Sequence, residues 1–108
     1  MAEVVVGKAD RGSSIQVGRG DAIIIRLDEN PTTGYRWAID HLDEAVLSAA
    51  GSDFTLGPGG GIGGGGERVF SFRARGPGTG RIELKLWRDW EGDASTVERF
   101  DLIANVSA

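Results

Sequence analysis

The chain of 108 residues contains no cysteine, and this absence excludes a group of chemistries. Without thiols there is no disulfide bond, no zinc site built on thiolates and no cysteine nucleophile. Histidine is scarce as well, because His41 is the only one. A Ser-His-Asp triad would have to use His41, whose neighbours carry no nucleophile signal, so we interpret it as a solvated loop histidine. We expect no enzyme, no metal site and no cofactor.

The sequence also lacks a long hydrophobic run and an excess of basic residues. No apolar run approaches the roughly 20 residues of a membrane span. The formal net charge of −4 argues against nucleic acid and anionic membranes as partners. The start, MAEVVVGKAD, lacks the basic region and apolar core of a signal peptide. We therefore expect an intracellular protein, or the mature form of a secreted or periplasmic one.

Glycine is present in excess, with 18 residues and a run, GPGGGIGGGGE, from Gly57 to Glu67. A Walker loop would need Gly-Lys-Ser/Thr after its glycines, and here Glu67 follows. A dinucleotide fingerprint would need a following helix, but the next residues alternate like a strand. We interpret the run as a flexible loop whose bare backbone is able to pair with another chain by strand addition.

Apolar and polar residues alternate along much of the chain, which is the period of a β-strand. The alternation predicts that Ile23, Ile25 and Leu27 share the inward face of one strand. On a later strand, Arg81, Glu83 and Lys85 fall on the outward face. The other residues expected to point inward are Tyr35, Trp37, Ile39, Phe70, Phe72, Ala74, Ile82, Leu84, Leu86, Phe100, Leu102, Ala104 and Val106.

About seven such strands, separated by turns rich in glycine or proline, predict an all-β fold: an immunoglobulin-like antiparallel β-sandwich. Residues 43–52, DEAVLSAAGS, do not alternate, and we expect a loop with a short turn there. The length and the 40% apolar content predict a single domain over residues 1–108.

The segment NPTTGY combines several turn-forming residues between two predicted strands. Asn30 is able to cap a turn, Pro31 fixes its own φ angle, and Gly34 supplies a positive φ. Turn chemistry alone does not require both Thr32 and Thr33. We therefore consider two interpretations: a rigid connection between strands, or a rigid loop held out for contact with a partner.

Two tryptophans flank the Arg-Asp pair near the last predicted hairpin, where Trp87 continues a strand and Trp90 lies at the tip. An exposed tryptophan is costly unless it packs or binds. Trp90 either folds back onto the sheet or anchors a partner, since Trp and Arg are enriched at interface hot spots. One hypothesis is therefore an adhesion or carbohydrate-binding module that uses the Trp87/Trp90 hairpin.

Taken in order, NPTTGY, the glycine run and RDW resemble the chagasin family of small inhibitors of papain-like cysteine peptidases. That family carries an N-P-T-T-G-Y/F loop, a G-x-G-G loop and an R-P-W loop on an immunoglobulin-like sandwich. The resemblance spans the chain from Asn30 to about Phe100. It implies a reversible, non-covalent inhibitor that occludes the cleft of a papain-like cysteine peptidase with a wedge of three loops and is a monomer when free.

The resemblance also implies a set of contact residues, with Thr32 and Thr33 nearest the catalytic residues of the peptidase. For the glycine loop, Gly63–Gly66 fits the family spacing best, while Gly61–Gly64 also spells the motif. Asp89 stands where the family has proline, so the tip of that loop loses a fixed φ and gains a negative charge. The implied peptidase-binding residues are Asn30, Pro31, Thr32, Thr33, Gly34, Tyr35, Gly63, Gly64, Gly65, Gly66, Arg88 and Trp90.

Overall fold

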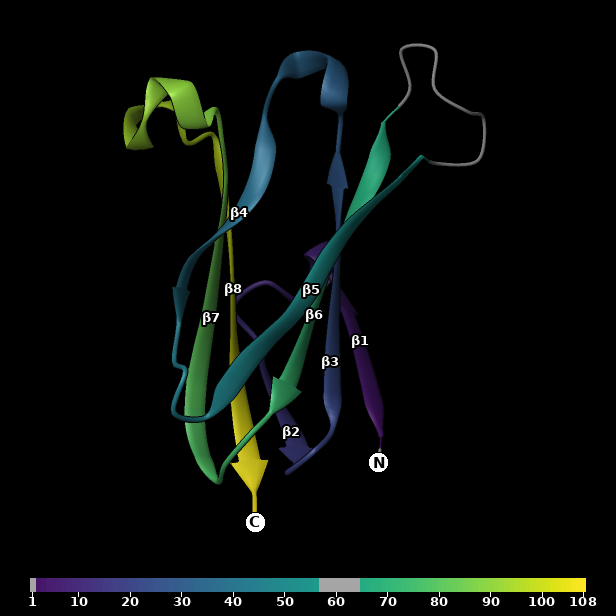
Figure 1. Ribbon diagram of the computed structural model, residues 1–108, viewed down its shortest axis with the longest axis vertical. Helices are drawn as coiled ribbons and strands as arrows, with labels where there is room; N and C mark the ends of the chain where they lie inside the picture. Colours follow the sequence, from purple (N-terminus) through teal and green to yellow (C-terminus); the bar gives the residue numbers. More distant parts are fainter. Residues whose placement is uncertain (1, 57–64) are drawn as a thin grey trace.

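Two four-stranded sheets form the protein, and their inner faces pack against each other (Figure 1). The computed structural model describes residues 2–56 and 65–108. The first sheet has the strand order β1 (Glu3–Gly7), β3 (Ala22–Glu29), β6 (Gly66–Ala74) and β5 (Leu47–Leu56). The second has the order β2 (Ser14–Gly18), β8 (Glu98–Ser107), β7 (Gly78–Trp87) and β4 (Arg36–Leu42). The prediction of an all-β, immunoglobulin-like sandwich is confirmed.

The core consists of the alternating residues that the sequence places inward. Ile23, Ile25 and Leu27 of β3 are at most 1% exposed. Their neighbours on β6 are Phe72 and Phe70, which pair with Ile23 and Ile25. From the second sheet the core receives Ile82, Leu84, Phe100, Leu102, Ala104 and Val106. Each large side chain buried in this way contributes about 1.5–3 kcal/mol, so the two sheets hold their connecting loops in fixed positions.

Each sheet contains one parallel pair, which the expectation of antiparallel strands did not include. β1 runs parallel to β3, and β2 runs parallel to β8. The reason is the path of the chain: it leaves β1 through the 3-10 helix η1 (Lys8–Asp10), crosses to β2 in the second sheet, and returns to β3 beside β1. The other strand pairs are antiparallel.

The structure has an eighth strand where we expected a loop. Residues 44–46 do form a turn, but β5 begins at Leu47 and pairs with β6 over its full length. A bulge between Ala49 and Gly51 shifts the register and interrupts the alternation that identifies a strand in a sequence. A second bulge lies between Ile39 and His41, which places His41 on β4 rather than in a loop and leaves Ile39 38% exposed.

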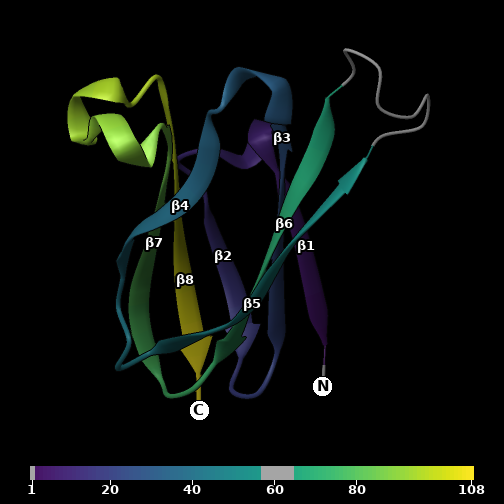
Figure 2. The same cartoon turned by 45° about the horizontal axis from the view of Figure 1, so that its top comes forward.

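The candidate contact segments gather at one end of the sandwich (Figures 1 and 2). The connection from β3 to β4 lies between the connection from β7 to β8 and the paired ends of β5 and β6. The C-terminus lies at the opposite end. The fold therefore brings segments that are far apart in the sequence to one surface.

Candidate functional site

The first loop, Asn30–Tyr35, is a single capped 3-10 turn, η2 (Pro31–Thr33). The side chain of Asn30 accepts a hydrogen bond from the amide of Thr32 at 3.0 Å, and Pro31 occupies the first helical position. Gly34 ends the turn with φ +79°, a left-handed conformation that favours glycine. The predicted roles of Asn30, Pro31 and Gly34 are confirmed.

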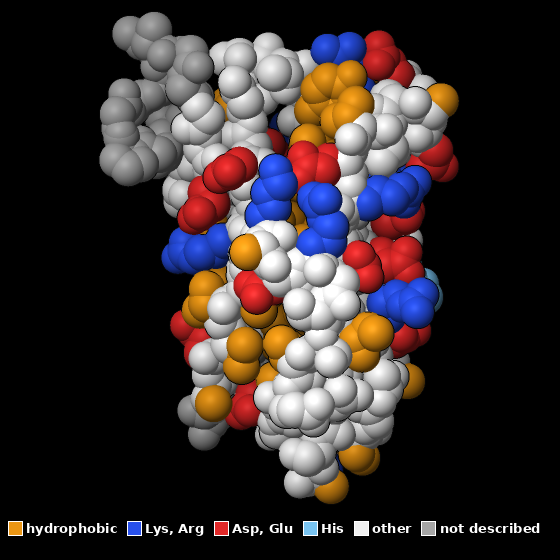
Figure 3. Space-filling view, turned by 180° about the vertical axis from the view of Figure 1, so that it is seen from behind, with side chains coloured by type: hydrophobic (Ala, Val, Ile, Leu, Met, Phe, Trp, Pro, Cys, Tyr) orange, Lys and Arg blue, Asp and Glu red, His pale blue; other side chains and the backbone are white. Residues whose placement is uncertain are grey.

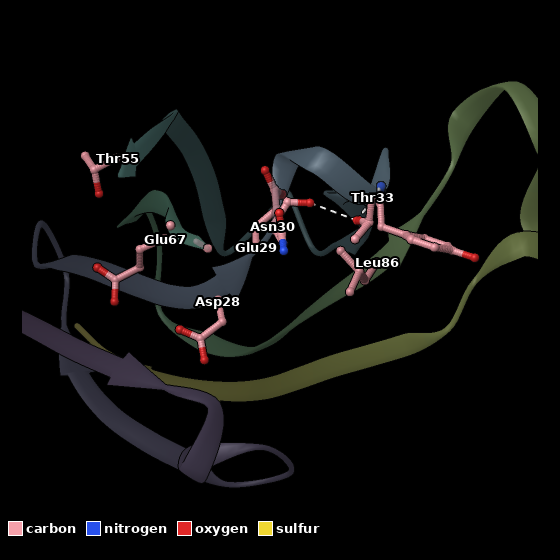
Figure 4. Close-up of a pocket in the computed structure, with 10 residues that line it drawn as sticks. Asp28, Glu29, Asn30, Thr33, Thr55, Glu67 and Leu86 are labelled. Carbon is pink, nitrogen blue, oxygen red and sulfur yellow. Dashed lines mark hydrogen bonds between the residues drawn. The ribbon is translucent and has the colours of Figure 1, made fainter. Parts of the chain in front are cut away.

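Both threonine hydroxyls also form hydrogen bonds within the turn, a role that turn preferences alone did not require of them. The hydroxyl of Thr32 donates to Oδ1 of Asn30 at 2.7 Å. The hydroxyl of Thr33 donates to the carbonyl of Asn30 at 2.8 Å and accepts from the amide of Tyr35 at 3.2 Å (Figure 4). The loop thus carries its own internal hydrogen bonds, while Thr32 and Thr33 remain on its exposed side.

A buried ion pair of the first sheet lies at the base of the first loop, and its carboxylate also bonds to the second sheet. Glu29, the last residue of β3, has a side chain only 2% exposed and pairs with Arg68 of β6 at 2.7 Å. The same carboxylate accepts from the amide of Trp37 on β4 at 2.7 Å. The indole of Trp37 in turn donates to the carbonyl of Asp28 at 2.9 Å. Both ends of the loop are therefore clamped, and removing one partner of such a pair costs about 3–5 kcal/mol.

Sequence reasoning missed Glu29, although a signal was present. Glu29 continues the inward row of Ile23, Ile25 and Leu27, so a carboxylate falls on an apolar face. A charged residue at an inward position needs a partner, because an unpaired buried charge is strongly unfavourable. The signal predicts a buried ion pair at the end of β3, but it does not identify Arg68 as the partner.

The third loop, Arg88–Ser95, consists of two short 3-10 helices, η3 (Asp89–Glu91) and η4 (Asp93–Ser95). The hydroxyl of Ser95 closes it by accepting from the amide of Arg88 at 3.0 Å and donating to the carbonyl of Gly92 at 2.7 Å. Trp90 lies on η3 and is 67% exposed. Asp89, in the place of the family's proline, is exposed beside it.

Lys85 attaches the third loop to the second sheet. It lies on the outward face of β7, as the alternation predicts, but it is buried there rather than exposed to solvent. The third loop folds back over β7, so Lys85 is only 7% exposed. Its ammonium contacts Asp93 of the loop at 2.5 Å and Asp40 of β4 at 3.3 Å, and it lies 3.8 Å from the ring centre of Trp87. The hydrogen bond to Asp93 raises the pKa of Lys85, and the hydrogen bond from Lys85 lowers the pKa of Asp40.

The first and third loops contact each other directly. The guanidinium of Arg88 donates to the carbonyl of Thr33 through Nε at 3.3 Å and a terminal nitrogen at 3.0 Å. It also stacks on the ring of Tyr35, 4.3 Å from the ring centre. Trp90 packs on Gly34 so closely that a Cβ built on this glycine would lie 2.8 Å from Cη2 of the indole. These contacts join the two loops into one surface.

The glycine segment is described only in part. Gly63 and Gly64, like Gly61 and Ile62 of the alternative register, lie outside the described residues. Gly65 is exposed before β6, whereas Gly66 is buried inside β6. A Cβ on Gly66 would overlap the carbonyl oxygen of Thr55 and the Phe54 ring, so this position requires glycine for packing within the sheet.

The first loop is a ridge with a hollow on each side. One hollow, of about 780 Å³, lies between the loop and the start of β6, and Asp28 and Glu67 line it (Figure 4). The other, of about 420 Å³, lies between the loop and Trp90. Hydrophobic side chains are exposed beside charged ones of both signs at this end of the molecule (Figure 3). A narrow ridge with a rigid base has the shape that fits a cleft in a partner.

Residues 2–56 and 65–108 contain neither a candidate metal site nor a candidate membrane-spanning helix. No group of three or more His, Asp or Glu side chains in these ranges is placed to hold a metal ion. No helix there has the length and hydrophobicity needed to cross a membrane.

Comparison with known proteins identifies a family and several relatives that are similar to this chain. The model of the chagasin family peptidase inhibitor I42 matches residues 16–104. Chagasin of Trypanosoma cruzi is 30% identical over 104 residues, which cover 88% of this chain and 90% of chagasin. A cysteine protease inhibitor of Entamoeba histolytica shares the fold with a TM-score of 0.87 at 22% identity, over 98% of this chain and 96% of that one. The inhibitor named ICP of Leishmania mexicana has a TM-score of 0.63 at 30% identity, over 87% and 89% of the two chains.

Proposed function

Because the chain belongs to the chagasin family of peptidase inhibitors, we propose that its first loop enters the active-site cleft of a papain-like cysteine peptidase. The chain is an inhibitor of this peptidase class and not an enzyme. The first and third loops, with Gly65 just before β6, form the wedge that blocks the cleft. The observation that supports this assignment is the ridge of the first loop, which is clamped at its base and joined to Trp90.

Rigidity of the ridge supports tight binding. A loop that is already ordered loses little conformational entropy when it docks. Here the Thr33 hydroxyl, the Glu29 carboxylate and the Arg88 guanidinium each fix part of the first loop before any partner arrives. The chain contains no cysteine, so a mixed disulfide with the catalytic thiol cannot form. Inhibition by docking of the rigid loop is then reversible and non-covalent.

The hypothesis of a carbohydrate-binding module is not favoured. Such a module would use the faces of Trp87 and Trp90 as a stacking platform. The Lys85 ammonium already lies 3.8 Å from the ring centre of Trp87, and Trp90 packs against Gly34 of the first loop. The two rings are thus engaged with different parts of the protein.

Titration of papain with the purified protein tests the function, and a Trp90→Ala variant tests the site. We expect the wild type to inhibit papain, and we expect Trp90→Ala to weaken inhibition about 30-fold, the effect of losing a hot spot of about 2 kcal/mol. Val5→Ala is the matched control, because Val5 is a similarly exposed apolar residue on β1, away from the loops. Equal inhibition by Trp90→Ala and Val5→Ala would exclude Trp90 from the contact surface.

Variants of Thr33 separate its two roles. Thr33→Val keeps the branched shape but removes the hydroxyl that bonds Asn30 and Tyr35. Thr33→Ser keeps the hydroxyl and removes the methyl group. If internal order of the loop matters most, Thr33→Val weakens inhibition more than Thr33→Ser. The reverse order would show that the methyl group contacts the peptidase.

A further inference from the structure

A protein loop that enters a peptidase active site presents peptide bonds to the enzyme, and the first loop has one bond that is held in a distinctive way. The carbonyl oxygen of Thr33 belongs to the Thr33–Gly34 peptide bond. Arg88 donates two N–H groups to this oxygen, at 3.3 Å and 3.0 Å. A carbonyl oxygen has two lone pairs, so these two donors use its full capacity.

Other contacts hold the guanidinium over this carbonyl. Its plane stacks on the Tyr35 ring at 4.3 Å, and its third nitrogen lies 3.6 Å from the carboxylate of Glu91. The backbone of Arg88 is itself fixed by the Ser95 hydroxyl. The side chain therefore cannot leave Thr33 without losing its stacking and its ion pair as well.

Two other carbonyls of the loop, those of Asn30 and Pro31, have partners within the turn. The carbonyl of Asn30 accepts from the amide and the hydroxyl of Thr33. The carbonyl of Pro31 accepts from the amide of Gly34 at 3.3 Å. These bonds are local and come from the 3-10 turn, whereas the carbonyl of Thr33 depends on a side chain 55 residues away in the sequence.

Cleavage by a cysteine peptidase requires the carbonyl oxygen to be free. The thiolate attacks the carbonyl carbon, and the oxygen becomes an oxyanion held by donors of the peptidase at about 2.7–3.1 Å. The C–N bond then breaks, the amine leaves with a proton from the catalytic histidine, and water later hydrolyses the thioester. A carbonyl already occupied by Arg88 cannot enter the oxyanion hole unless the guanidinium withdraws.

We propose that Arg88 protects the Thr33–Gly34 peptide bond from hydrolysis by the bound peptidase. Arg88 is then a positioning residue that keeps the inhibitor from becoming a substrate, in addition to joining the two loops. The inference rests on the proposed function, because it requires the first loop to lie in the cleft. Without Arg88 the oxygen of Thr33 becomes available, and the peptidase cuts the loop between Thr33 and Gly34.

The test is incubation of the wild type and Arg88→Met with papain, followed by mass spectrometry of the intact chain and its fragments. We expect Arg88→Met to yield two fragments, residues 1–33 and 34–108, at least about tenfold faster than the wild type, because a charge-assisted hydrogen bond is lost. Papain activity should recover as this cut proceeds. Arg81→Met is the matched control, because Arg81 is exposed on β7 away from the loops and its loss leaves Thr33 covered.

An Arg88→Met chain that inhibits papain and stays intact would overturn the inference, and so would a first cut at any other bond. Cuts at many sites would indicate that Arg88→Met is unfolded. In that case the Arg88→Lys variant tests the inference instead. Lysine keeps the charge but lacks the planar fork, so cleavage only at Thr33–Gly34 supports the inference and an intact chain overturns it. A wild type that leaves papain fully active counts against the proposed function, on which the inference rests, whereas an Arg88→Met chain that inhibits papain and stays intact counts against the inference alone.

Discussion

Gly34 shows how one residue serves two purposes at the centre of the site. Its φ of +79° closes the 3-10 turn, and its missing side chain makes room for the indole of Trp90. The first requirement can be predicted from the sequence, because Gly at the end of a turn is a familiar pattern. The second cannot, since it depends on a residue from another loop. Glycine at this position therefore supports both the shape of the first loop and the placement of the third.

Substitution of Gly34 by alanine separates the two requirements when it is compared with Gly12→Ala. Gly12 has nearly the same φ, +78°, but nothing lies within 4 Å of its Cβ position. Gly12→Ala should destabilise the fold by about 1–2 kcal/mol through backbone strain alone. We expect Gly34→Ala to cost more and to displace Trp90. Thermal unfolding measures the difference, and quenching of tryptophan fluorescence by acrylamide reports the displacement.

Equal losses of stability and equal quenching in the two variants would show that Trp90 does not depend on Gly34. The comparison is informative because the backbone strain is the same in both. Any excess effect in Gly34→Ala therefore comes from the contact with the indole.

Residue roles in the first loop were only partly accessible from the sequence. Asn30, Pro31 and Gly34 follow from turn chemistry, because their preferences are local. The hydroxyls of Thr32 and Thr33 were missed, since their bonds to Asn30 appear only once the chain has adopted the 3-10 turn. The bond from Arg88 to Thr33 spans 55 residues and is set by the approach of two loops, which no local pattern contains.

At the scale of elements, the third loop is held by ionic contacts. Lys85 bridges Asp93 of the loop and Asp40 of β4, and Arg99 of β8 also reaches Asp40 at 2.9 Å. The hydrogen bond from Lys85 is the main reason that the pKa of Asp40 lies below its ordinary value of 3.8. Attachment of the loop should therefore depend on pH.

The pH dependence of stability should follow the ionisation of Asp40. Its pKa is lower in the folded state than in the unfolded state, so its contribution is complete above the unfolded pKa and is lost as the pH falls through the folded one. The melting temperatures of the wild type and Asp40→Asn should differ most above about pH 5 and converge at lower pH. The raised pKa of Lys85 keeps its charge through neutral and moderately alkaline pH.

Asp53→Asn is the control for this series. Asp53 is an exposed carboxylate on β5 with no salt bridge among the residues that the structure describes. Its melting temperatures should follow those of the wild type at every pH. A constant gap between the wild type and Asp40→Asn down to the lowest pH would show that the ionised carboxylate does not hold the loop.

The alternation of apolar residues predicted the elements of the core well and those at its margins less well. β3, β6, β7 and β8 alternate without interruption, and the inward residues expected on them are buried, Leu86 only in part. β5 was not predicted because the bulge between Ala49 and Gly51 interrupts its alternation of apolar and polar residues. Lys85 was placed in solvent because alternation identifies the face of a strand but does not reveal which loop covers that face.

At the scale of the whole molecule, the first and the last strand have unequal importance. β8 lies between β2 and β7 in the second sheet, whereas β1 is an edge strand of the first. β8 contributes the buried residues Phe100, Leu102, Ala104 and Val106, and β1 contributes only Val6. The fold therefore depends more on β8 than on β1.

Deletion of residues 98–108 should abolish folding, whereas deletion of residues 1–7 should only lower the melting temperature. Phe100, Leu102 and Val106 together contribute several kcal/mol at about 1.5–3 kcal/mol each, out of a total of about 5–15 kcal/mol for a small domain. Circular dichroism during heating measures both deletions. A cooperative transition in the chain without β8 would contradict the expectation, as would its absence in the chain without β1.

The place of β8 has a consequence for biosynthesis. Residues 14–18 of β2 pair in the second sheet with residues 103–107 of β8. β2 therefore cannot form this pairing until the ribosome has synthesised β8. At about 5–20 residues per second, the ribosome needs several seconds to synthesise the residues between the two strands. The loops cannot acquire their rigid arrangement until then. A nascent chain therefore cannot restrain a peptidase, and inhibition begins only after β8 has left the ribosome.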